Sequence, residues 1–514
     1  MKIEKAERAM IDTIQSNNGL RLYLENLSRG RQMTPHSWLY EKEDSQKTLE
    51  RWIPIMESAN NRTSFGAEFN SFDLKQVEKF GPQGGIPPID SPEVWDVLEP
   101  LYSPTDYDKP NALDNWLTVA DEFGRSVFRS IRRSDPLSFE SVVSDMKRRD
   151  TLTTNSGYPR FTRRMRTVQQ EVQDARAGVA YDYPAIVLFR YYYGKLRPVW
   201  MFPMAVNLIE ASYALKIQSE LAHSPLRWVV DYCSPWQGFE YVKRTLTMQW
   251  TGQQVDGGDT TKMDAHMRPA QLMIVYTIVR WLFQERYWDD LYRSIMYINS
   301  IDLLIGPDKI VRGLHGLASG SSWTQLSETV LQLFMAYVAK TYGQGIGDDF
   351  YWINSMSAEE LVAFLGKFGL PANETKQSVS KDSLTFLQRY FHQGFFSRED
   401  ARVLGGYYPT IRALGSMLMP EKFHDPKSWN SDMFCIRNYT ILENCVDDPS
   451  FGEFVKFVAH GHPDMIPFAK NRPSVIDRLQ KQARSVPGLF PSYNQEKLTK
   501  PLSSFQAIAI AREL

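Results

Sequence analysis

Cysteine is scarce in this sequence, the chain as a whole has almost no net charge, and long hydrophobic runs are missing. Only three cysteines occur in 514 residues, without a CxxC spacing, which excludes a disulfide framework and is typical of reduced thiols in an intracellular protein. The formal net charge of −1 excludes a global positive field, so any nucleic-acid site must be local. The longest apolar runs, at 185–189 and 273–279, are far too short to span a bilayer. The charged, amphipathic N-terminus is unlike a signal peptide, so we expect no membrane partner.

The chain is long enough to bury a large core. With 514 residues and 43% hydrophobic content, it predicts about three domains or one large multi-lobed domain. Residues 1–110 mix short helical patterns with many loop signals, and seven prolines fall between positions 82 and 110. This predicts ordered coil wrapped over other parts of the chain rather than an independent domain. From about residue 397 onward the pattern is helical and loop-rich, without recognisable chemistry.

The stretch 343–353, GQGIGDDFYWI, places a glycine and two aspartates between two apolar-flanked runs. A glycine before two acids suits a tight hairpin that pushes carboxylates out of the sheet, where both can reach the same ion. The alternative is a solvated acidic turn, which composition alone allows in about one unrelated chain of this length in ten. Asp348 and Asp349 therefore need support from residues elsewhere in the chain.

Residues 160–197 form a locally basic segment with interleaved aromatic residues. The segment holds eight Lys or Arg against three acids. Basic side chains follow phosphates and aromatic faces stack bases, so this is the composition of a channel for single-stranded nucleic acid. The alternative is an ordinary solvated surface on which arginine stems cover apolar area. Lys195 and Arg197 alternate along a predicted strand, so both side chains face one side and suit a phosphate group.

The segment 253–264 predicts a strand that ends at Asp259, followed by a turn and then a helix opened by Pro269. A strand that ends in an aspartate offers a carboxylate at the edge of a sheet. A buried unpaired acid is costly, so such acids usually hold cations or cap turns. Capping of local turns by Asp259 and Asp264 is the alternative.

Three further elements follow along the chain. Residues 318–324 form a loop of small residues that leads into a helix ending near Gly343. Ser357 and Glu360 make a capping box for a helix that ends at Gly369. Residues 384–391 are strand-like.

Seven motifs occur in a fixed order. They are TNSGYP at 154–159, KLRP at 195–198, DTTKMD at 259–264, SGSSWT at 319–324, GDD at 347–349, a following lysine, and FLQRYF at 386–391. This order resembles that of viral RNA-dependent RNA polymerases, first the picobirnavirus type and second the partitivirus type, over roughly residues 150–395. The resemblance implies an α+β fold, a closed right-hand polymerase with fingers, palm and thumb, whose antiparallel palm sheet is flanked by helices. The implied domains are an N-terminal segment bridging fingers and thumb (1–110), fingers with the elements that admit template and nucleotide (111–245), palm (246–275), a fingers insertion (276–305), palm (306–396), and thumb with the C-terminal tail (397–514).

The resemblance implies chemistry with two Mg²⁺ ions, or with Mn²⁺ in their place. Asp259 and Asp348 match the metal-binding aspartates of the family, and Asp349 matches an auxiliary acid. Asp256, three residues upstream of Asp259, is an alternative metal ligand. Mg²⁺ suits such a site because it takes one or two carboxylates and completes its shell with water and substrate phosphates.

Four basic residues match positions that handle phosphate in the family. Lys195 and Arg197 match the residues that grip the incoming triphosphate, and a planar guanidinium fits phosphate oxygens well. Lys376 falls where the family places a general acid for pyrophosphate, with Lys381 as the second choice.

The sugar and the RNA strands are assigned in the same way. Asp264, Ser319, Gly320 and Thr324 match the residues that bind the nucleotide and sense its 2′-hydroxyl, the group that separates RNA from DNA. Many relatives carry an Asn about eight to ten residues after that serine, where this chain has Ser, Glu and Thr at 327–329. The segment TNSGYP resembles the loop that guides the template, and FLQRYF resembles the hairpin that grips the primer strand. The implied RNA-binding residues are Thr154, Ser156, Gly157, Arg160, Arg163, Arg164 and Arg389.

The resemblance implies an RNA-dependent RNA polymerase of a double-stranded RNA virus. Such an enzyme copies a single-stranded RNA template into nascent RNA from ribonucleoside triphosphates (rNTPs), for genome replication and transcription. We expect a monomer that works with a capsid protein, in the virion interior and the host cell cytoplasm. Three alternatives are a reverse transcriptase, a nucleotide cyclase and a non-catalytic RNA-binding, capsid-associated protein. A reverse transcriptase is disfavoured because Ile346 stands where an aromatic residue is usual. A nucleotide cyclase is disfavoured because such domains are much shorter than this chain.

Overall fold

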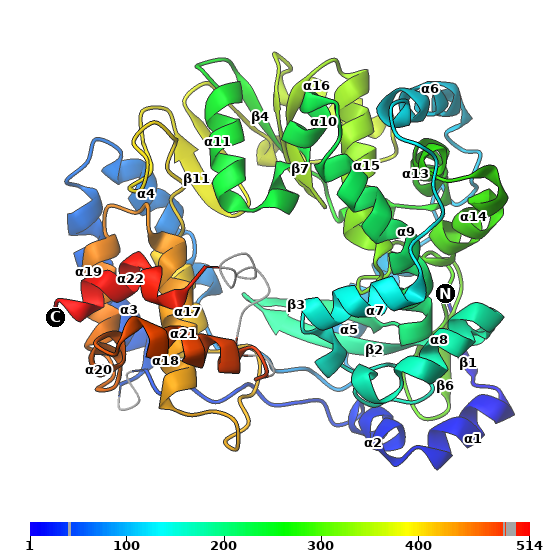
Figure 1. The fold of residues 1–514 in the computed structure, drawn as a ribbon, viewed down its shortest axis with the longest axis horizontal. Coiled ribbons are helices and arrows are strands. Elements are labelled where there is room, and N and C mark those ends of the chain that lie inside the picture. Colours follow the sequence, from blue (N-terminus) through cyan, green and yellow to red (C-terminus); the bar gives the residue numbers. More distant parts are fainter. Residues whose placement is uncertain (40–42, 487–488, 490–499) are drawn as a thin grey trace. The chain divides into compact units, whose positions relative to one another are not determined.

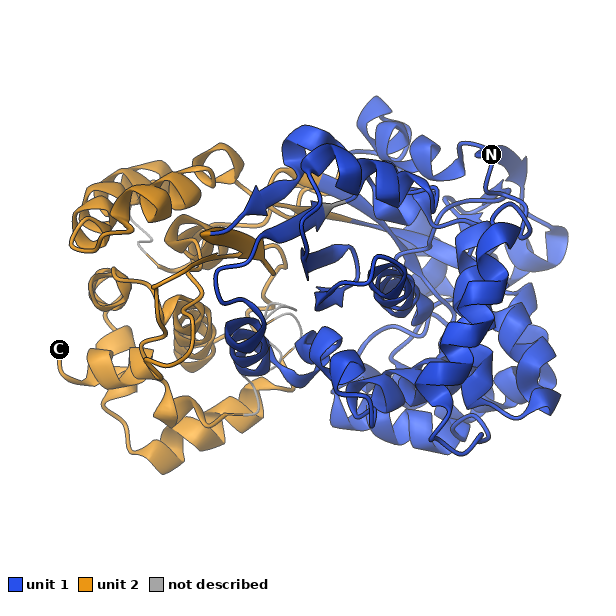
Figure 2. Ribbon diagram, turned by 90° about the horizontal axis from the view of Figure 1, so that it is seen from above, with its two compact units in different colours: residues 1–30, 87–189, 196–381 blue, residues 31–86, 190–195, 382–514 orange. Residues whose placement is uncertain are grey.

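The computed structural model describes residues 1–39, 43–486, 489 and 500–514, apart from the side chain of Asp259. The chain divides into two compact units, each assembled from separate stretches of sequence (Figure 2). Unit 1 comprises residues 1–30, 87–189 and 196–381, and unit 2 comprises 31–86, 190–195 and 382–514. The division into fingers, palm and thumb stays a prediction.

A four-stranded antiparallel sheet lies at the centre of the motif-bearing part of unit 1. Its order is β7 (Tyr342–Ile346), β8 (Asp349–Ile353), β4 (Val255–Asp259) and β9 (Ser378–Ser380). The helices α10 (Arg227–Tyr232), α11 (Phe239–Gln249), α15 (Trp323–Val338) and α16 (Ala358–Gly366) lie beside it (Figure 1). This is the antiparallel, helix-flanked sheet that the sequence predicted, and the α+β class is confirmed.

A second sheet has the order β1 (Lys2–Lys5), β6 (Lys309–Arg312), β5 (Leu303–Leu304), β2 (Ala185–Tyr192) and β3 (Lys195–Met201). The β2–β5 pair is parallel, whereas β1–β6 and β5–β6 are antiparallel. Apolar side chains of Ile14, Leu20 and Leu24 pack with Ile186 and Ile310 of this sheet, so the first two helices cover it. The remaining helices of unit 1 are α1 (Arg8–Ser16), α2 (Asn18–Asn26), α5 (Pro92–Tyr102), α6 (Leu117–Phe128), α7 (Phe139–Arg148), α8 (Val168–Ala177), α9 (Met204–Ala222), α12 (Met263–His266), α13 (Pro269–Val279) and α14 (Trp288–Tyr297).

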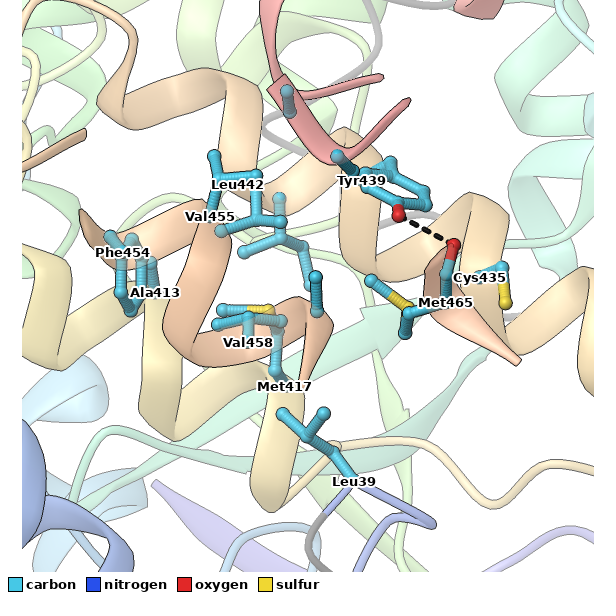
Figure 3. Packing of buried hydrophobic residues seen from close by; sticks show 14 of the residues in the cluster. Leu39, Ala413, Met417, Cys435, Tyr439, Leu442, Phe454, Val455, Val458 and Met465 are labelled. Atoms are coloured by element: carbon cyan, nitrogen blue, oxygen red, sulfur yellow. Dashed lines mark hydrogen bonds between the residues drawn. The ribbon is translucent and has the colours of Figure 1, made fainter. Parts of the chain in front are cut away.

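Unit 2 is mostly helical. Its elements are α3 (Ser45–Asn60), α4 (Gly66–Leu74), the hairpin β10 (Ser383–Phe386) and β11 (Arg389–His392), α17 (Thr410–Leu418), α18 (Ser431–Leu442), α19 (Phe451–Ala459), α20 (Met465–Ala469), α21 (Pro473–Ala483) and α22 (Gln506–Arg512). Figure 3 shows part of its apolar core, in which the Tyr439 hydroxyl donates to the Met465 carbonyl at 2.6 Å. Trp52 Nε1 donates to Thr410 Oγ1 at 2.8 Å, which ties α3 to a helix far along the chain.

Several local predictions are confirmed. A two-residue turn joins β7 to β8 at Gly347 and Asp348, a helix begins at Pro269, and Ser357 forms a capping box with Glu360. The predicted helix after residue 324 spans Trp323–Val338, although it ends before Gly343.

Two local predictions are wrong in part. The described residues of 1–110 contain five α-helices, α1 to α5, rather than mostly coil, and four of them precede the proline-rich stretch 82–110. Pro92 itself occupies the first turn of α5, where a missing N–H is tolerated. The stretch 384–391 folds as the hairpin that the resemblance implies, so its strand-like residue pattern is wrong only in predicting one continuous strand. Its turn residues Leu387 and Gln388 both have positive φ, 49° and 62°, a conformation usually signalled by Asn or Gly. Among the described helices, none has the length and apolar character needed to cross a membrane.

Candidate active site

The turn between β7 and β8 carries the first aspartate of GDD. Ile346 pairs with Asp349, which leaves Gly347 and Asp348 as the turn residues. Gly347 has φ of +60°, as the first position of a type II′ hairpin turn requires, and Asp348 is exposed. Two hydrogen bonds attach the turn to α15. The Gly347 N–H donates to Thr329 Oγ1 at 2.9 Å, and the Gln332 amide donates to the Gly347 carbonyl.

The strand β4 brings Asp259 to the same end of the sheet. In the β4–β8 pair, Asp259 lies opposite Asp349 and Gly258 opposite Phe350. Directly opposed residues of antiparallel strands have Cα atoms about 4.5–5.5 Å apart. The backbones of these two acids are therefore adjacent, although the side chain of Asp259 is outside the described part of the structure.

Asp256 belongs elsewhere. Asp256 lies three positions before Asp259 on β4, so by the two-residue period of a strand the two positions belong to opposite faces of the sheet. Asp256 is fully buried, accepts from Gln254 Nε2 at 3.0 Å, and its burial raises its pKa to about 6. The structure does not bring this alternative metal ligand to the face of Asp259.

Asp264 meets a buried acid that the sequence reasoning did not assign to the site. Its carboxyl group is hydrogen-bonded to that of Glu328 on α15, which is 5% exposed. A bond between two carboxyl groups needs one shared proton. Burial raises the pKa of both groups, the negative charge of Asp348 raises both further, and the Arg197 guanidinium lowers that of Asp264. Asp264 thus lies within electrostatic reach of Glu328, Asp348 and Arg197, and Glu328 lies within reach of Asp348.

The signal for Glu328 was present in the sequence but had no interpretation. It stands nine residues after Ser319, within the stretch 327–329 where the resemblance led us to expect an Asn. Only the helical geometry of α15 shows that its side chain turns toward Asp264.

The predicted phosphate-binding residues of β3 face one side. Lys195 and Arg197 are both exposed, with the less exposed Leu196 between them. Within unit 2, the pKa of Lys79 is lowered, first by burial and then by the positive charges of Lys195 and Arg412. Lys79 therefore lies near both of these cations. Such a cluster of like charges suits an anionic ligand.

The loop of small residues before α15 has a constrained backbone. Gly320 has φ of +117°, and a Cβ there would overlap the Trp200 carbonyl oxygen. The Ser319 carbonyl accepts from the Trp200 N–H at 2.7 Å, and Thr324 Oγ1 donates to the Ala318 carbonyl at 2.9 Å. The loop is thereby seated against the end of β3.

Lys376 lies just before β9, at the end of a short 3₁₀ turn, and it is exposed. In the β4–β9 pair Ser378 lies opposite Gly257, so the antiparallel register leads back from Ser378 toward Asp259. Lys376 therefore approaches the Asp259 end of β4, as its predicted role requires.

Among the seven predicted RNA-binding residues, Thr154 and Arg163 are exposed, whereas Ser156 is fully buried. Arg160 forms ion pairs with Glu171 and Asp174, and Arg164 donates to Asn155 O and Asn207 Oδ1. Ser156, Arg160 and Arg164 hold the shape of the loop around Gly157.

Arg389, the predicted phosphate contact of the hairpin, is buried within unit 2. It is 8% exposed, its Nη2 donates to Asn444 Oδ1 at 3.2 Å, and its guanidinium lies 5.0 Å from the centre of the Tyr408 ring. The structure thus gives Arg389 a packing role within unit 2, and its contact with RNA stays a prediction.

No group of three His, Cys, Asp or Glu side chains with metal-binding geometry occurs among the described residues. The side chain of Asp259 was not part of that set.

Comparison with known proteins defines the class first. No family model matches the chain. A crystal structure of the RNA-dependent RNA polymerase of a human picobirnavirus has the same fold, with a TM-score of 0.79 and 21% identity, covering 99% of this chain and all of that one. The structure of an insertion-loop deletion mutant of that enzyme gives 0.76 and 22%, with the same coverage. The chain has the fold of a viral RNA-dependent RNA polymerase.

Sequence similarity points to the particular type. The chain is 26% identical to a protein described as a potential RNA-dependent RNA polymerase of human picobirnavirus (strain Human/Thailand/Hy005102/-), over 93% of this chain and 91% of that protein. It is 25% identical over 149 residues, 28% of each chain, to the RNA-directed RNA polymerase of Cryptosporidium parvum virus 1 (strain KSU-1). These relatives support an RNA-directed RNA polymerase enzyme, most like the picobirnavirus type.

Proposed function

We propose that the protein is the RNA-dependent RNA polymerase of a double-stranded RNA virus and joins rNTPs on an RNA template by a two-metal mechanism. One observation carries this proposal. The β4–β8 register sets Asp259 opposite Asp349 and next to the turn that holds Asp348, so three acids from distant parts of the sequence gather at one end of one sheet.

The residues at this end of the sheet fit Mg²⁺. The strand register gathers the three acidic positions 259, 348 and 349 at this end of the sheet. Crowded carboxylate oxygens are the donor set of hard divalent cations. In this proposal Asp259 and Asp348 hold the ions and Asp349 assists. Ions held there would supply the charge that favours deprotonation of a 3′-hydroxyl and departure of pyrophosphate.

The protein's own side chains bind and orient the substrates. Lys195 and Arg197 bind the triphosphate from one face of β3, where charge-assisted hydrogen bonds to phosphate are strong. Asp264 accepts the hydrogen of the ribose 2′-hydroxyl while Glu328 fixes its orientation through their shared proton. Lys376, exposed before β9, gives a proton to pyrophosphate.

The direct test is nucleotide incorporation by the purified protein on a single-stranded RNA template. We expect template-dependent incorporation of rNTPs that stops on chelation of divalent metal and resumes with excess Mg²⁺. Preferential use of deoxynucleotides would instead point to a reverse transcriptase. RNA binding without incorporation under any metal would point to a structural RNA-binding protein.

Replacing Arg197 with alanine should raise the KM for nucleotide. Loss of one charge-assisted hydrogen bond to phosphate corresponds to roughly 10- to 100-fold in binding. If Arg197 binds ground state and transition state alike, kcat changes little. Steady-state incorporation at varied rNTP concentration measures both constants. An unchanged KM would assign Arg197 a structural role.

The same proposal includes the setting. We propose a monomer that replicates and transcribes the genome in association with capsid protein, within the virion and the host cytoplasm. This part rests on the resemblance of the motif order to polymerases of double-stranded RNA viruses. Co-sedimentation of the protein with purified capsids tests it.

A further inference from the structure

Glu210 is a buried acid that no part of the proposed mechanism uses. It lies on α9, is 1% exposed, and forms no ion pair with any described Lys or Arg. Its carboxylate accepts three hydrogen bonds: from Ser321 Oγ at 2.7 Å, from the Ser322 N–H at 3.0 Å and from Asn207 Nδ2 at 3.2 Å. A buried charge without a counter-ion is unfavourable, and burial raises the pKa of Glu210 to about 7. An apolar side chain would fill this space without the free-energy cost of burying a carboxyl group. The role of Glu210 is therefore to accept these three hydrogen bonds.

Two of those donors belong to the loop of small residues. Ser321 donates to Glu210 and also accepts from the Trp323 N–H at 3.0 Å, at the first residue of α15. The carboxylate therefore sits at the N-terminal end of a 16-residue helix, where the helix dipole favours negative charge. Together with the Ser319–Trp200 bond, these contacts fix the loop between α9 and β3.

The third donor leads to the template-guiding segment. Asn207 donates to Glu210, and its own side-chain oxygen accepts from Arg164 Nη2 at 2.9 Å. Arg164 in turn donates through Nε to the Asn155 carbonyl at 3.2 Å. A continuous chain of hydrogen bonds thus runs from residue 155 through Arg164, Asn207 and Glu210 to the loop.

The helix α15 connects the 319–324 loop to the residues around Gly347 and Asp264. Thr329 and Gln332 of this helix hold the backbone of Gly347, and Glu328 holds Asp264. Gln332 lies nine residues after Trp323 on one continuous helix, about 2.5 turns, so a shift of the first residue would displace these side chains as well.

We propose that Glu210 is a positioning residue that holds the 319–324 loop in the geometry that binds the incoming rNTP and ties this loop to the template-guiding segment. The proposal rests on the proposed polymerase function and adds a residue outside the seven motifs. Glu210 touches neither substrate, and it acts through Ser321, Ser322 and Asn207.

Glu210→Gln tests the proposal with little change of volume. A neutral amide accepts more weakly and turns an N–H toward one of the donors, so the loop loses a charge-assisted hydrogen bond. We expect the KM for rNTP to rise roughly 10-fold or more, with a smaller change in kcat. Affinity for template RNA should fall as well, because the same carboxylate holds Asn207 of the hydrogen-bond chain to residue 155. Glu220→Gln is the matched control, since Glu220 lies on the same helix and its ion-pair partner among the described residues is Lys216, four positions earlier. Its KM should equal that of the wild type.

Ser321→Ala is the second variant, because it removes the loop's side of the bond without touching α9. It should raise the KM in the same direction, and the double variant should show less than the sum of the two effects because both break one bond. Additive effects, or a Glu210→Gln variant with an unchanged KM, would overturn the proposal. So would a variant that loses only thermal stability and recovers wild-type KM at lower temperature. A wild-type protein that incorporates no nucleotide would overturn the proposed function itself, and this inference with it.

Discussion

Asp348→Ala should lower nucleotide incorporation by about 10²–10³-fold or more while leaving the fold and template binding nearly intact. The reason is chemical: removing one preorganised group that stabilises transition-state charge commonly has an effect of this size. The structural reason for an intact fold is equally direct, because Asp348 is an exposed residue of a two-residue turn whose shape depends on Gly347, Thr329 and Gln332. Incorporation of labelled rNTP and fluorescence anisotropy with labelled template measure the two properties separately.

Asp308→Ala is the matched control for this experiment. Asp308 is also an exposed acid in a turn of unit 1, between β5 and β6, and no role in catalysis is proposed for it. Its activity should equal that of the wild type. Full activity in the Asp348 variant would remove this residue from the mechanism, and loss of template binding together with activity would indicate a folding defect instead.

Gly258→Ala should destabilise the central sheet and reduce activity through the backbone of its neighbour Asp259. Gly258 lies opposite Phe350, and a Cβ at this position would overlap the Phe350 ring. That ring is fully buried, and its centroid lies 4.6 Å from the centroid of the Trp352 ring, so there is no free space into which Phe350 could rotate. Overpacking of this kind lowers the free energy of unfolding by about 1–3 kcal/mol. Denaturant unfolding followed by tryptophan fluorescence, with incorporation measured in parallel, gives the result.

Gly366→Ala provides the comparison. Gly366 is the last residue of α16, and an added Cβ there meets nothing within 4 Å. Replacing an exposed helical glycine by alanine usually stabilises by about 0.4–1 kcal/mol. If Gly258→Ala were as stable as Gly366→Ala, the close packing of β4 on β8 at this position would be refuted.

The parts of the site that the sequence predicted are those with a local signature. A glycine and two acids between apolar runs predicted the β7–β8 turn, and Pro269 predicted the start of α13, because both features depend on a few neighbouring residues. The alternation of Lys195 and Arg197 likewise needs only the period of a strand. The similarity to the picobirnavirus polymerase fold was accessible through the order of such motifs.

The parts that escaped prediction depend on partners distant in sequence. The role of Glu328 depends on the fold of α15, which places its side chain beside Asp264. The role of Glu210 depends on the packing of α9 against the 319–324 loop, where Ser321 donates to it. Arg389 looked like an RNA contact by charge, yet Asn444 and Tyr408 accommodate it inside unit 2. In each case a charged residue is buried against composition-based expectation because specific partners satisfy it.

The discontinuous makeup of unit 2 has a consequence during synthesis on the ribosome. Residues 31–86 emerge early, but Trp52 and Phe69 are buried against partners that follow residue 382. At translation rates of about 5–20 residues per second, the intervening 87–381 stretch takes roughly 15–60 s to emerge. For that interval the early helices expose apolar side chains with no native partner, so newly made chains should be captured by chaperones that recognise α3 and α4, and slowing translation of the middle of the message should lower the yield of soluble protein.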